Sequence, residues 1–148
     1  MSYQEKKNIV SLIGTLLVFV FYCLYVFERY PEATLNSTET FSFWASVILI
    51  LIPVSIVAKI IIYIVFNIIY RISTNEKEPS FADELDKIIE LKATRNSHYV
   101  FIIGFVLAMG SLVIDLPPYM MFIILIFSGF VSEMVGVITQ LYLYRKGV

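Results

Sequence analysis

Residues 41–70 have the sequence FSFWASVILILIPVSIVAKIIIYIVFNIIY, a run of 30 residues in which Lys59 is the only charged side chain. Three further apolar segments occupy residues 9–27, 98–115 and 119–144. An α-helix rises 1.5 Å per residue, so about 20 apolar residues cross the roughly 30 Å hydrocarbon core of a bilayer. The sequence therefore predicts an all-α, polytopic membrane protein in which all 148 residues form one domain with four transmembrane helices.

The composition supports this class and argues against several others. Hydrophobic residues make up 59% of the chain and charged residues 16%, against roughly 45–50% and about 25% in soluble domains. The net charge is −1 and the basic residues are scattered, so we expect no direct binding of nucleic acid. With one cysteine, Cys23, and one histidine, His98, no Cys/His zinc site can form within the chain, and we predict neither a metal nor a cofactor. The sequence has no motif for nucleophilic or metal-assisted catalysis, so we expect no catalytic residues and no enzyme activity.

The distribution of positive charge predicts how the chain is oriented. Nine of the eleven lysines and arginines lie in the N-terminus, the connection at residues 71–97 and the C-terminus. Four crossings place these three segments on the same side of the membrane. Because loops rich in lysine and arginine stay in the cytoplasm, both termini are predicted to be cytoplasmic in a multi-pass protein of the cell membrane.

The connection at residues 71–97 contains a helical pattern. Ser80 is a suitable N-cap, and apolar side chains then recur on one helix face. We predict a cytoplasmic amphipathic helix over residues 80–96, which either lies along the membrane surface or continues into the third span. Its apolar face rests on lipid or on the bundle in one interpretation and docks a soluble partner in the other. The partner-docking candidates are Phe81, Leu85, Asp86, Lys87, Ile88, Ile89 and Glu90.

Two charged residues are predicted inside the membrane. Glu133 lies near the middle of the fourth span, where a charged side chain costs about 2.5–3.5 kcal/mol on insertion scales. Lys59 is the only cation expected at comparable depth, about 6 Å away along the bilayer normal, and a lysine side chain has that reach. We predict an intramembrane ion pair between Lys59 and Glu133. In the alternative, Glu133 is protonated and bonded to hydroxyl groups while Lys59 extends to an interface.

Small and polar residues form a stripe along each predicted span when successive residues turn by about 100°. Such residues let helices approach closely in lipid, so we expect the stripes to face a shared interior. They are Ser11, Gly14, Thr15 and Tyr22 in the first span, Ser55, Lys59, Tyr63 and Asn67 in the second, Gly104, Ala108, Ser111 and Asp115 in the third, and Ser128, Gly129, Ser132, Glu133, Gly136, Thr139 and Gln140 in the fourth.

The sequence Asp-Glu-Leu-Asp at residues 83–86, followed by Glu-Leu-Lys-Ala at 90–93 and Asn-Ser-His-Tyr at 96–99, precedes the third span. This arrangement resembles small prokaryotic membrane proteins of unknown function that carry an Asp-Glu-Arg-Asp-type motif before a span. The likeness covers about half of the chain, and Leu85 stands where the motif has arginine. Members of that group are often encoded beside helix-turn-helix regulators, so the resemblance implies a regulatory partner.

These observations lead to two functional hypotheses. In the first, the protein is a regulatory or interaction protein that docks a cytosolic regulatory protein through the helix at residues 80–96. In the second, it is a small transport, permeation or immunity protein that uses Lys59 and Glu133. Membrane lipids are expected partners in both, and a pathway built from so few helices would need a second copy of the chain.

Overall fold

The computed structural model describes residues 2–29, 37–76 and 84–147. They form four α-helices, namely α1 (Tyr3–Arg29), α2 (Ser37–Thr74), α3 (Glu84–Val113) and α4 (Pro118–Lys146). The described residues contain no strand, and each helix is long and apolar enough to cross a membrane. The chain is therefore an all-α, multi-pass membrane protein, which confirms the predicted fold class.

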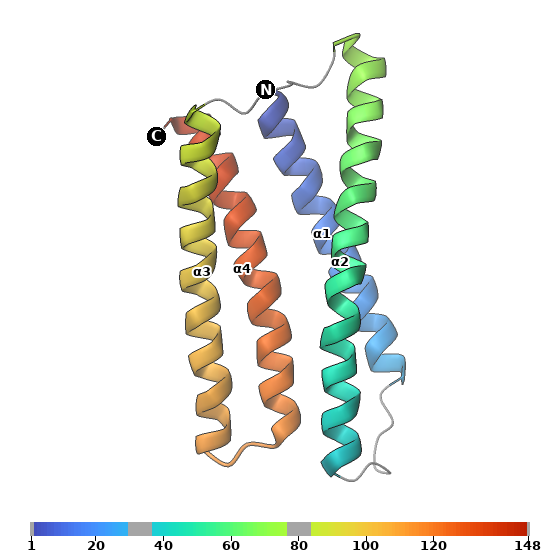
Figure 1. Cartoon of the computed structure of the whole chain (residues 1–148), viewed down its shortest axis with the longest axis vertical. Coiled ribbons are helices and arrows are strands. Elements are labelled where there is room, and N and C mark those ends of the chain that lie inside the picture. Colours follow the sequence, from blue (N-terminus) through green and yellow to red (C-terminus); the bar gives the residue numbers. More distant parts are fainter. Residues whose placement is uncertain (1, 30–36, 77–83, 148) are drawn as a thin grey trace.

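The helices are arranged as two pairs (Figure 1). α3 packs closely on α4, α1 crosses α2, and contacts between α1 and α4 join the two pairs. α2 meets α4 over a shorter stretch. In the described part of the chain, α4 is the only helix whose backbone lies close to that of α3. The start of α1 and the end of α4 lie at the same end of the bundle, which we call the terminal end. We call the opposite end, where α3 turns into α4, the hairpin end.

α2 is the longest helix. Its 38 residues continue unbroken through Pro53, although proline removes one backbone hydrogen bond inside a helix. At 1.5 Å per residue the helix is about 57 Å long, well above the hydrocarbon thickness. Figure 1 shows that α2 projects beyond the other helices at the terminal end. The excess length is therefore accommodated by protrusion.

The turn between α3 and α4 is defined by backbone hydrogen bonds. The amide of Leu116 donates to the carbonyl of Ser111 at 3.0 Å, and the amide of Asp115 donates to the carbonyl of Leu112 at 3.2 Å. This is the Schellman pattern of a helix C-terminus, and Asp115 adopts the left-handed conformation (φ 62°) that glycine usually supplies there. Pro118 then begins α4, a position where the missing amide hydrogen is not needed. The proline pair thus ends one helix and starts the next.

Small side chains bring α3 and α4 together. Gly104, Ala108 and Ser111 of α3 are buried, as is Ser132 of α4. A side chain at Gly104 would overlap Ser128, and one at Gly136 would touch Ser97. Except for Ser97, these positions belong to the predicted stripes, so the expected close packing is present in this hairpin. In contrast, Asp115 is exposed at its end.

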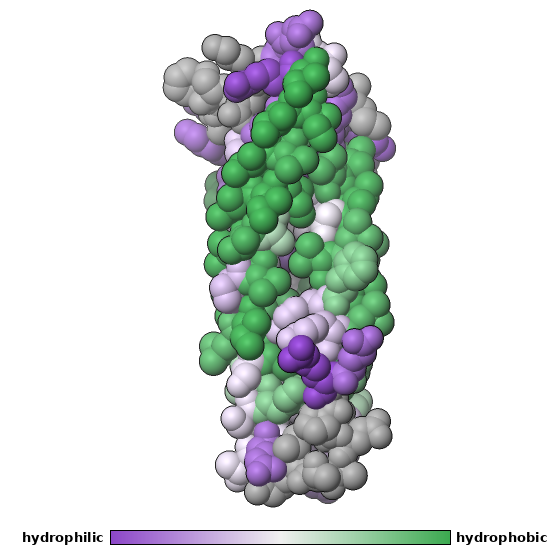
Figure 2. Space-filling model, turned by 90° about the vertical axis from the view of Figure 1, so that its right-hand side faces the viewer, coloured by the Kyte–Doolittle hydropathy of each residue, from purple (hydrophilic) through white to green (hydrophobic). Residues whose placement is uncertain are grey.

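A compact apolar cluster fills the hairpin end between α1, α2 and α4. Val26, Trp44 and Val47 are buried there and pack against a surrounding shell of larger side chains. Elsewhere, most long aliphatic side chains point outward. Figure 2 shows one side of the molecule, on which hydrophobic residues cover the middle and hydrophilic residues gather toward the two ends. This distribution suits a chain whose solvent along the middle is lipid.

The structure distinguishes between the two arrangements expected for the helix predicted at residues 80–96. From Glu84 onward the chain forms a single helix, α3, that continues without interruption into the third span. This is the second of the two arrangements expected from the sequence. The physical reason is that residues 91–99 contain no proline or glycine that would end a helix. The predicted cap Ser80 and the candidate Phe81 lie outside the described residues.

Candidate functional site

The structure brings together the two charged residues predicted inside the membrane. The ammonium nitrogen of Lys59 on α2 contacts a carboxylate oxygen of Glu133 on α4. α2 and α4 run in the same direction through the bundle, so the two positions meet at the same height (Figure 1). Glu133 is about 20 Å from either end of α4, well inside the hydrophobic region.

This ion pair is not enclosed by the bundle. The Lys59 side chain is 54% exposed and the Glu133 side chain 28% exposed. In the hydrocarbon layer a charged pair gains from mutual contact, but its remaining hydrogen-bonding groups still need partners. The pair is therefore open to whatever surrounds the bundle at that depth, whether lipid, water or a ligand.

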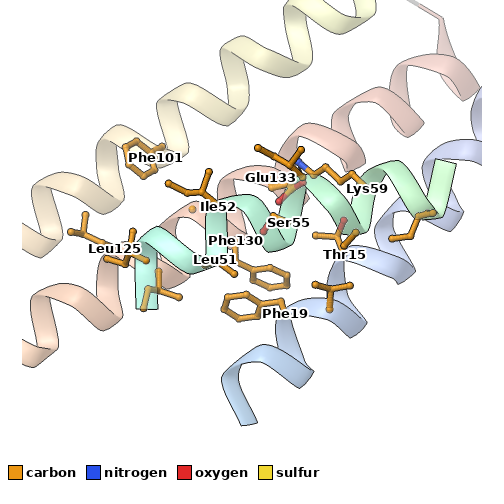
Figure 3. A pocket seen from close by; sticks show the side chains of 17 residues that line it. Thr15, Phe19, Leu51, Ile52, Ser55, Lys59, Phe101, Leu125, Phe130 and Glu133 are labelled. Atoms are coloured by element: carbon orange, nitrogen blue, oxygen red, sulfur yellow. The ribbon is translucent and has the colours of Figure 1, made fainter. Parts of the chain in front are cut away.

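The pair lines a partly open groove of about 480 Å³ between α1, α2 and α4. Phe101 of α3 also lines this groove. In Figure 3 the polar groups of Lys59, Glu133, Ser55 and Thr15 lie toward one end of this groove. We call this cavity the central groove.

The rest of the central groove is apolar. Phe19 of α1 and Phe130 of α4 are stacked in its wall, with ring centroids 4.0 Å apart and planes within 10° of parallel. Leu51 and Ile52 of α2 face Leu125 of α4 across the cavity (Figure 3). The groove thus combines one charged pair with a long apolar surface, a layout that suits an amphipathic ligand.

A second, smaller cavity of about 200 Å³ lies beside the polar end of the central groove, toward the terminal end of the bundle. It shares Lys59 and Ile62 with the central groove and is also lined by Lys7 and Ser11 of α1 and by Tyr63 of α2. The ammonium group of Lys7 lies 4.8 Å from the centroid of the Tyr63 ring. Polar groups therefore extend from the terminal end of the bundle to the ion pair.

Toward the hairpin end the apolar cluster closes the bundle. The Tyr22 hydroxyl donates a 2.6 Å hydrogen bond to the carbonyl of Val47, which ties α1 to α2 beside the buried Trp44. No charged residue takes part in this cluster. Polar side chains therefore lie on the terminal-end side of the ion pair, and apolar packing lies on its hairpin-end side.

Polar contacts between α3 and α4 were only partly foreseen from the sequence. Ser97 and Ser132 share a hydrogen bond of 2.8 Å between their hydroxyls, and Ser132 Oγ also lies 2.9 Å from the carbonyl oxygen of Ser97. Asn96, the residue before Ser97, donates to Thr139 at 3.4 Å, and Thr139 lies about two turns beyond Ser132 toward the terminal end. The predicted third span begins at residue 98, so Ser97 lies outside the predicted stripe. Its spacing of seven residues from Gly104 would have placed it on the same stripe.

The partner-docking candidates do not form one free surface. Ile89 is 1% exposed because it packs in the bundle, and Asp86 accepts a 2.6 Å hydrogen bond from the Tyr144 hydroxyl of α4. Leu85 and Ile88 are exposed by 46% and 44%. The remaining candidates, Lys87 and Glu90, are also exposed, and Phe81 lies outside the described residues.

Within the described ranges no three His, Cys, Asp or Glu side chains come close enough to hold a metal ion. His98 is exposed on α3, and Cys23 is half-buried on α1 as a free thiol. Comparisons with protein-family models, with curated proteins and with solved structures find no match, so a functional proposal rests on the geometry of the chain itself.

Proposed function

We propose that this protein binds a lipid-soluble, amphipathic molecule in the central groove, as the binding step of a small transport or permeation protein. The observation that supports the proposal is the position of the Lys59–Glu133 pair at one end of an otherwise apolar groove. The ligand class is a molecule with an oxygen-bearing head, such as a carboxylate or carbonyl group, and an apolar tail.

The hydrogen-bonding capacity of Lys59 determines the kind of head group. A lysine ammonium has three N–H donors, and the described residues offer this one a single acceptor side chain, Glu133. Two donors remain available at a depth where water is scarce, so a ligand oxygen is a favourable partner. Glu133 supplies the charge opposite Lys59 in the absence of a ligand.

The size and shape of the groove determine the tail. A volume of about 480 Å³ lies within the range of roughly 300–1,000 Å³ that is usual for small-molecule sites. Apart from Thr15 and Ser55 near the ion pair, its walls are mainly aliphatic and aromatic. Lys7 and Ser11 in the neighbouring cavity place polar groups on the terminal-end side of the head group. The same pair therefore serves the transport, permeation or immunity class of function that its intramembrane position indicated.

A photoactivatable long-chain fatty acid tests this proposal directly. In phosphatidylcholine vesicles it should label groove residues such as Phe101 and Leu125, and an excess of unlabelled fatty acid should compete. Ser55→Trp fills the groove and should abolish the labelling. Ile61→Trp, on an exposed position of α2 that does not line the groove, is the matched control and should leave labelling intact. Equal labelling of both variants would contradict the proposal.

Movement across the membrane needs its own measurement. Vesicles that contain the protein and an internal pH-sensitive dye report how fast a fatty acid carries protons across the bilayer. The rate is compared with that of vesicles without the protein. Glu133→Gln should remove the protein-dependent component, since the variant loses the charge opposite Lys59. If Glu133→Gln binds fatty acid and transports it at the original rate, the pair has no part in transport.

A second candidate function has a specific observation in its favour. Leu85 and Ile88 are exposed, and Leu91 on the next turn is 70% exposed, which leaves an apolar row at the start of α3. We propose that this row is the surface on which a cytosolic regulatory protein would dock. A photocrosslinker at Lys87 or Glu90 should then capture a soluble protein in cells, whereas one at Ile114 at the hairpin end should not. Recovery of only lipid and self-adducts from Lys87 and Glu90 would count against docking.

The orientation of the chain is part of both proposals. We propose that the terminal end faces the cytoplasm of the cell, because it carries most of the lysines and arginines. Cysteine introduced at Lys146 should resist a membrane-impermeant thiol reagent in intact cells, and cysteine introduced at Leu116 should react. Cys23 is replaced by alanine in both variants so that each has one thiol. The reverse labelling pattern would place the termini outside.

A further inference from the structure

A separate groove lies on α3 and α4 near the terminal end. It has a volume of about 320 Å³ and is lined by Lys92, Arg95 and Asn96 of α3 and by Ile138, Thr139 and Tyr142 of α4, among others. It shares no residue with the central groove. With successive residues turned by 100°, Lys92 and Arg95 fall on the opposite flank of α3 from Phe101, which lines the central groove. We call this groove on α3 and α4 the flank groove.

The flank groove has a strong positive bias. Its lining contains two cations and no acidic side chain. Neither Lys92 nor Arg95 forms an ion pair with any residue in the described parts of the chain. Two cations three residues apart on one helix repel each other, so an anion placed between them relieves that repulsion.

A third cation stands at the rim. The ammonium group of Lys146 lies 2.8 Å from the Tyr142 hydroxyl and 5.3 Å from the centroid of its ring. Tyr142 lines the flank groove and is exposed. Tyrosine with neighbouring lysine and arginine is the combination that lies at the headgroup level of a membrane. The base of the groove is held by the 3.4 Å hydrogen bond from Asn96 to Thr139, which joins the two helices.

An apolar track continues from the flank groove toward the hairpin end. On α3, Tyr99, Ile103 and Val106 follow the cations along the same flank and are exposed. On α4, Ile138 and Val131 form the facing row and are also exposed. A cluster of positive charge at the boundary with an exposed apolar track below it matches the two parts of a phospholipid, its anionic head and its acyl chains.

The flank groove also lies at the depth of the lipid headgroups. The apolar part of α3 begins at Tyr99, so Lys92 is about 10 Å beyond it toward the terminal end and Arg95 about 6 Å. Both side chains are long enough to place their charges among headgroups. We infer that the flank groove binds an anionic phospholipid of the leaflet at the terminal end, with its phosphate between Lys92 and Arg95 and its chains along the apolar track.

Native mass spectrometry of the full-length protein in detergent tests this inference with added phosphatidylglycerol and, separately, phosphatidylcholine. The protein should retain phosphatidylglycerol in preference to phosphatidylcholine. The double variant Lys92→Gln/Arg95→Gln should weaken phosphatidylglycerol binding by roughly 10- to 30-fold, since each interfacial cation contributes a few-fold to tenfold. Millimolar inorganic phosphate should not displace the lipid, because the acyl chains contribute to binding.

The matched control is Arg71→Gln/Lys87→Gln, which removes one arginine and one lysine that are exposed near the same end but do not line the flank groove. It should leave the affinity unchanged. The exchange Lys92→Arg/Arg95→Lys keeps both charges and should bind as the original protein does, which separates loss of charge from loss of folding. Equal binding of the two lipids, equal loss in the control, or displacement by phosphate alone would overturn the inference.

Discussion

Gly104 of α3 lies directly against Ser128 of α4, with no space between them for even a methyl group. A Cβ atom at Gly104 would overlap both Oγ and Cβ of Ser128. Ser128 cannot move freely, because its hydroxyl donates a 2.6 Å hydrogen bond to the carbonyl of Ile124. The separation of α3 and α4 is therefore set by a glycine, as it often is where helices pack in lipid.

Gly104→Ala should destabilise the α3–α4 hairpin, because the added methyl group pushes the two helices apart. Overpacking of this kind costs about 1–3 kcal/mol. Thermal unfolding of the purified protein in detergent, followed by circular dichroism, should show a lower midpoint. Gly110→Ala on the same helix is the control, since nothing lies within 4 Å of its Cβ position. Equal midpoints for the two variants would show that the close contact at Gly104 is not present in solution.

Ser97 and Ser132 should be energetically coupled. Their hydroxyls are 2.8 Å apart, and Ser132 Oγ is also 2.9 Å from the carbonyl oxygen of Ser97. Hydrogen bonds between membrane helices are worth about 0.6 kcal/mol on average and up to roughly 1.7. A double-mutant cycle with Ser97→Ala and Ser132→Ala should give a coupling energy in that range. The same cycle with Ser132→Ala and Ser46→Ala should give none, because Ser46 bonds to its own helix at the carbonyl of Ser42.

The fold was predictable because in lipid a backbone must satisfy its hydrogen bonds within each segment. Four apolar runs can then form four helices and little else. The turn after α3 was also predictable, since the proline pair Pro117-Pro118 disfavours helix in the residue before it and lacks amide donors. The point at which α3 enters the membrane was harder to predict. Residues 84–97 contain many charged residues that favour a helix, but their pattern does not show where the membrane begins. Only the structure shows that Ile89 packs in the bundle and that Asp86 is held by Tyr144.

For the candidate site, the sequence indicated the contact but not its surroundings. Counting residues along α2 and α4 was enough to expect Lys59 beside Glu133, because helical rise fixes relative depth. The central groove arises from the gap that remains where α3 packs on α4 and leaves α2 aside. That gap depends on how the pairs of helices cross. The residue pattern within a single helix does not determine the angle at which that helix crosses its neighbours.

The contact between Tyr144 and Asp86 should hold the first turns of α3 in place. Tyr144→Phe removes a 2.6 Å hydrogen bond to a carboxylate, which we expect to contribute about 1–2 kcal/mol at this half-buried position. Hydrogen exchange measured by mass spectrometry in detergent should become faster in residues 84–91. Tyr142→Phe loses an exposed bond with Lys146 instead and should leave exchange in this segment unchanged. Faster exchange in both variants would indicate general destabilisation.

The single variants Lys59→Met and Glu133→Leu should each destabilise the protein by about 1–3 kcal/mol. Each leaves one charge without its partner in a region of low dielectric constant, and partial access from the groove keeps the effect below that of a fully enclosed pair. The double variant Lys59→Met/Glu133→Leu leaves no charge and should recover most of the loss. Thermal unfolding in detergent and accumulation in the membrane both report on this. Lys87→Met, at an exposed position of α3, should change neither.

The exchanged pair Lys59→Glu/Glu133→Lys distinguishes an ion pair from two independent polar groups. If the residues attract each other as charges, the exchange should restore a large part of the stability that Lys59→Glu or Glu133→Lys loses alone. Each of those singles places two like charges together, so each should be worse than the corresponding neutral variant. If Glu133→Leu alone leaves the unfolding midpoint unchanged, Glu133 carries no charge that Lys59 stabilises. The contact between the two side chains would then be a hydrogen bond to a neutral carboxyl group, and the central groove would have a single charged residue with which to attract its ligand.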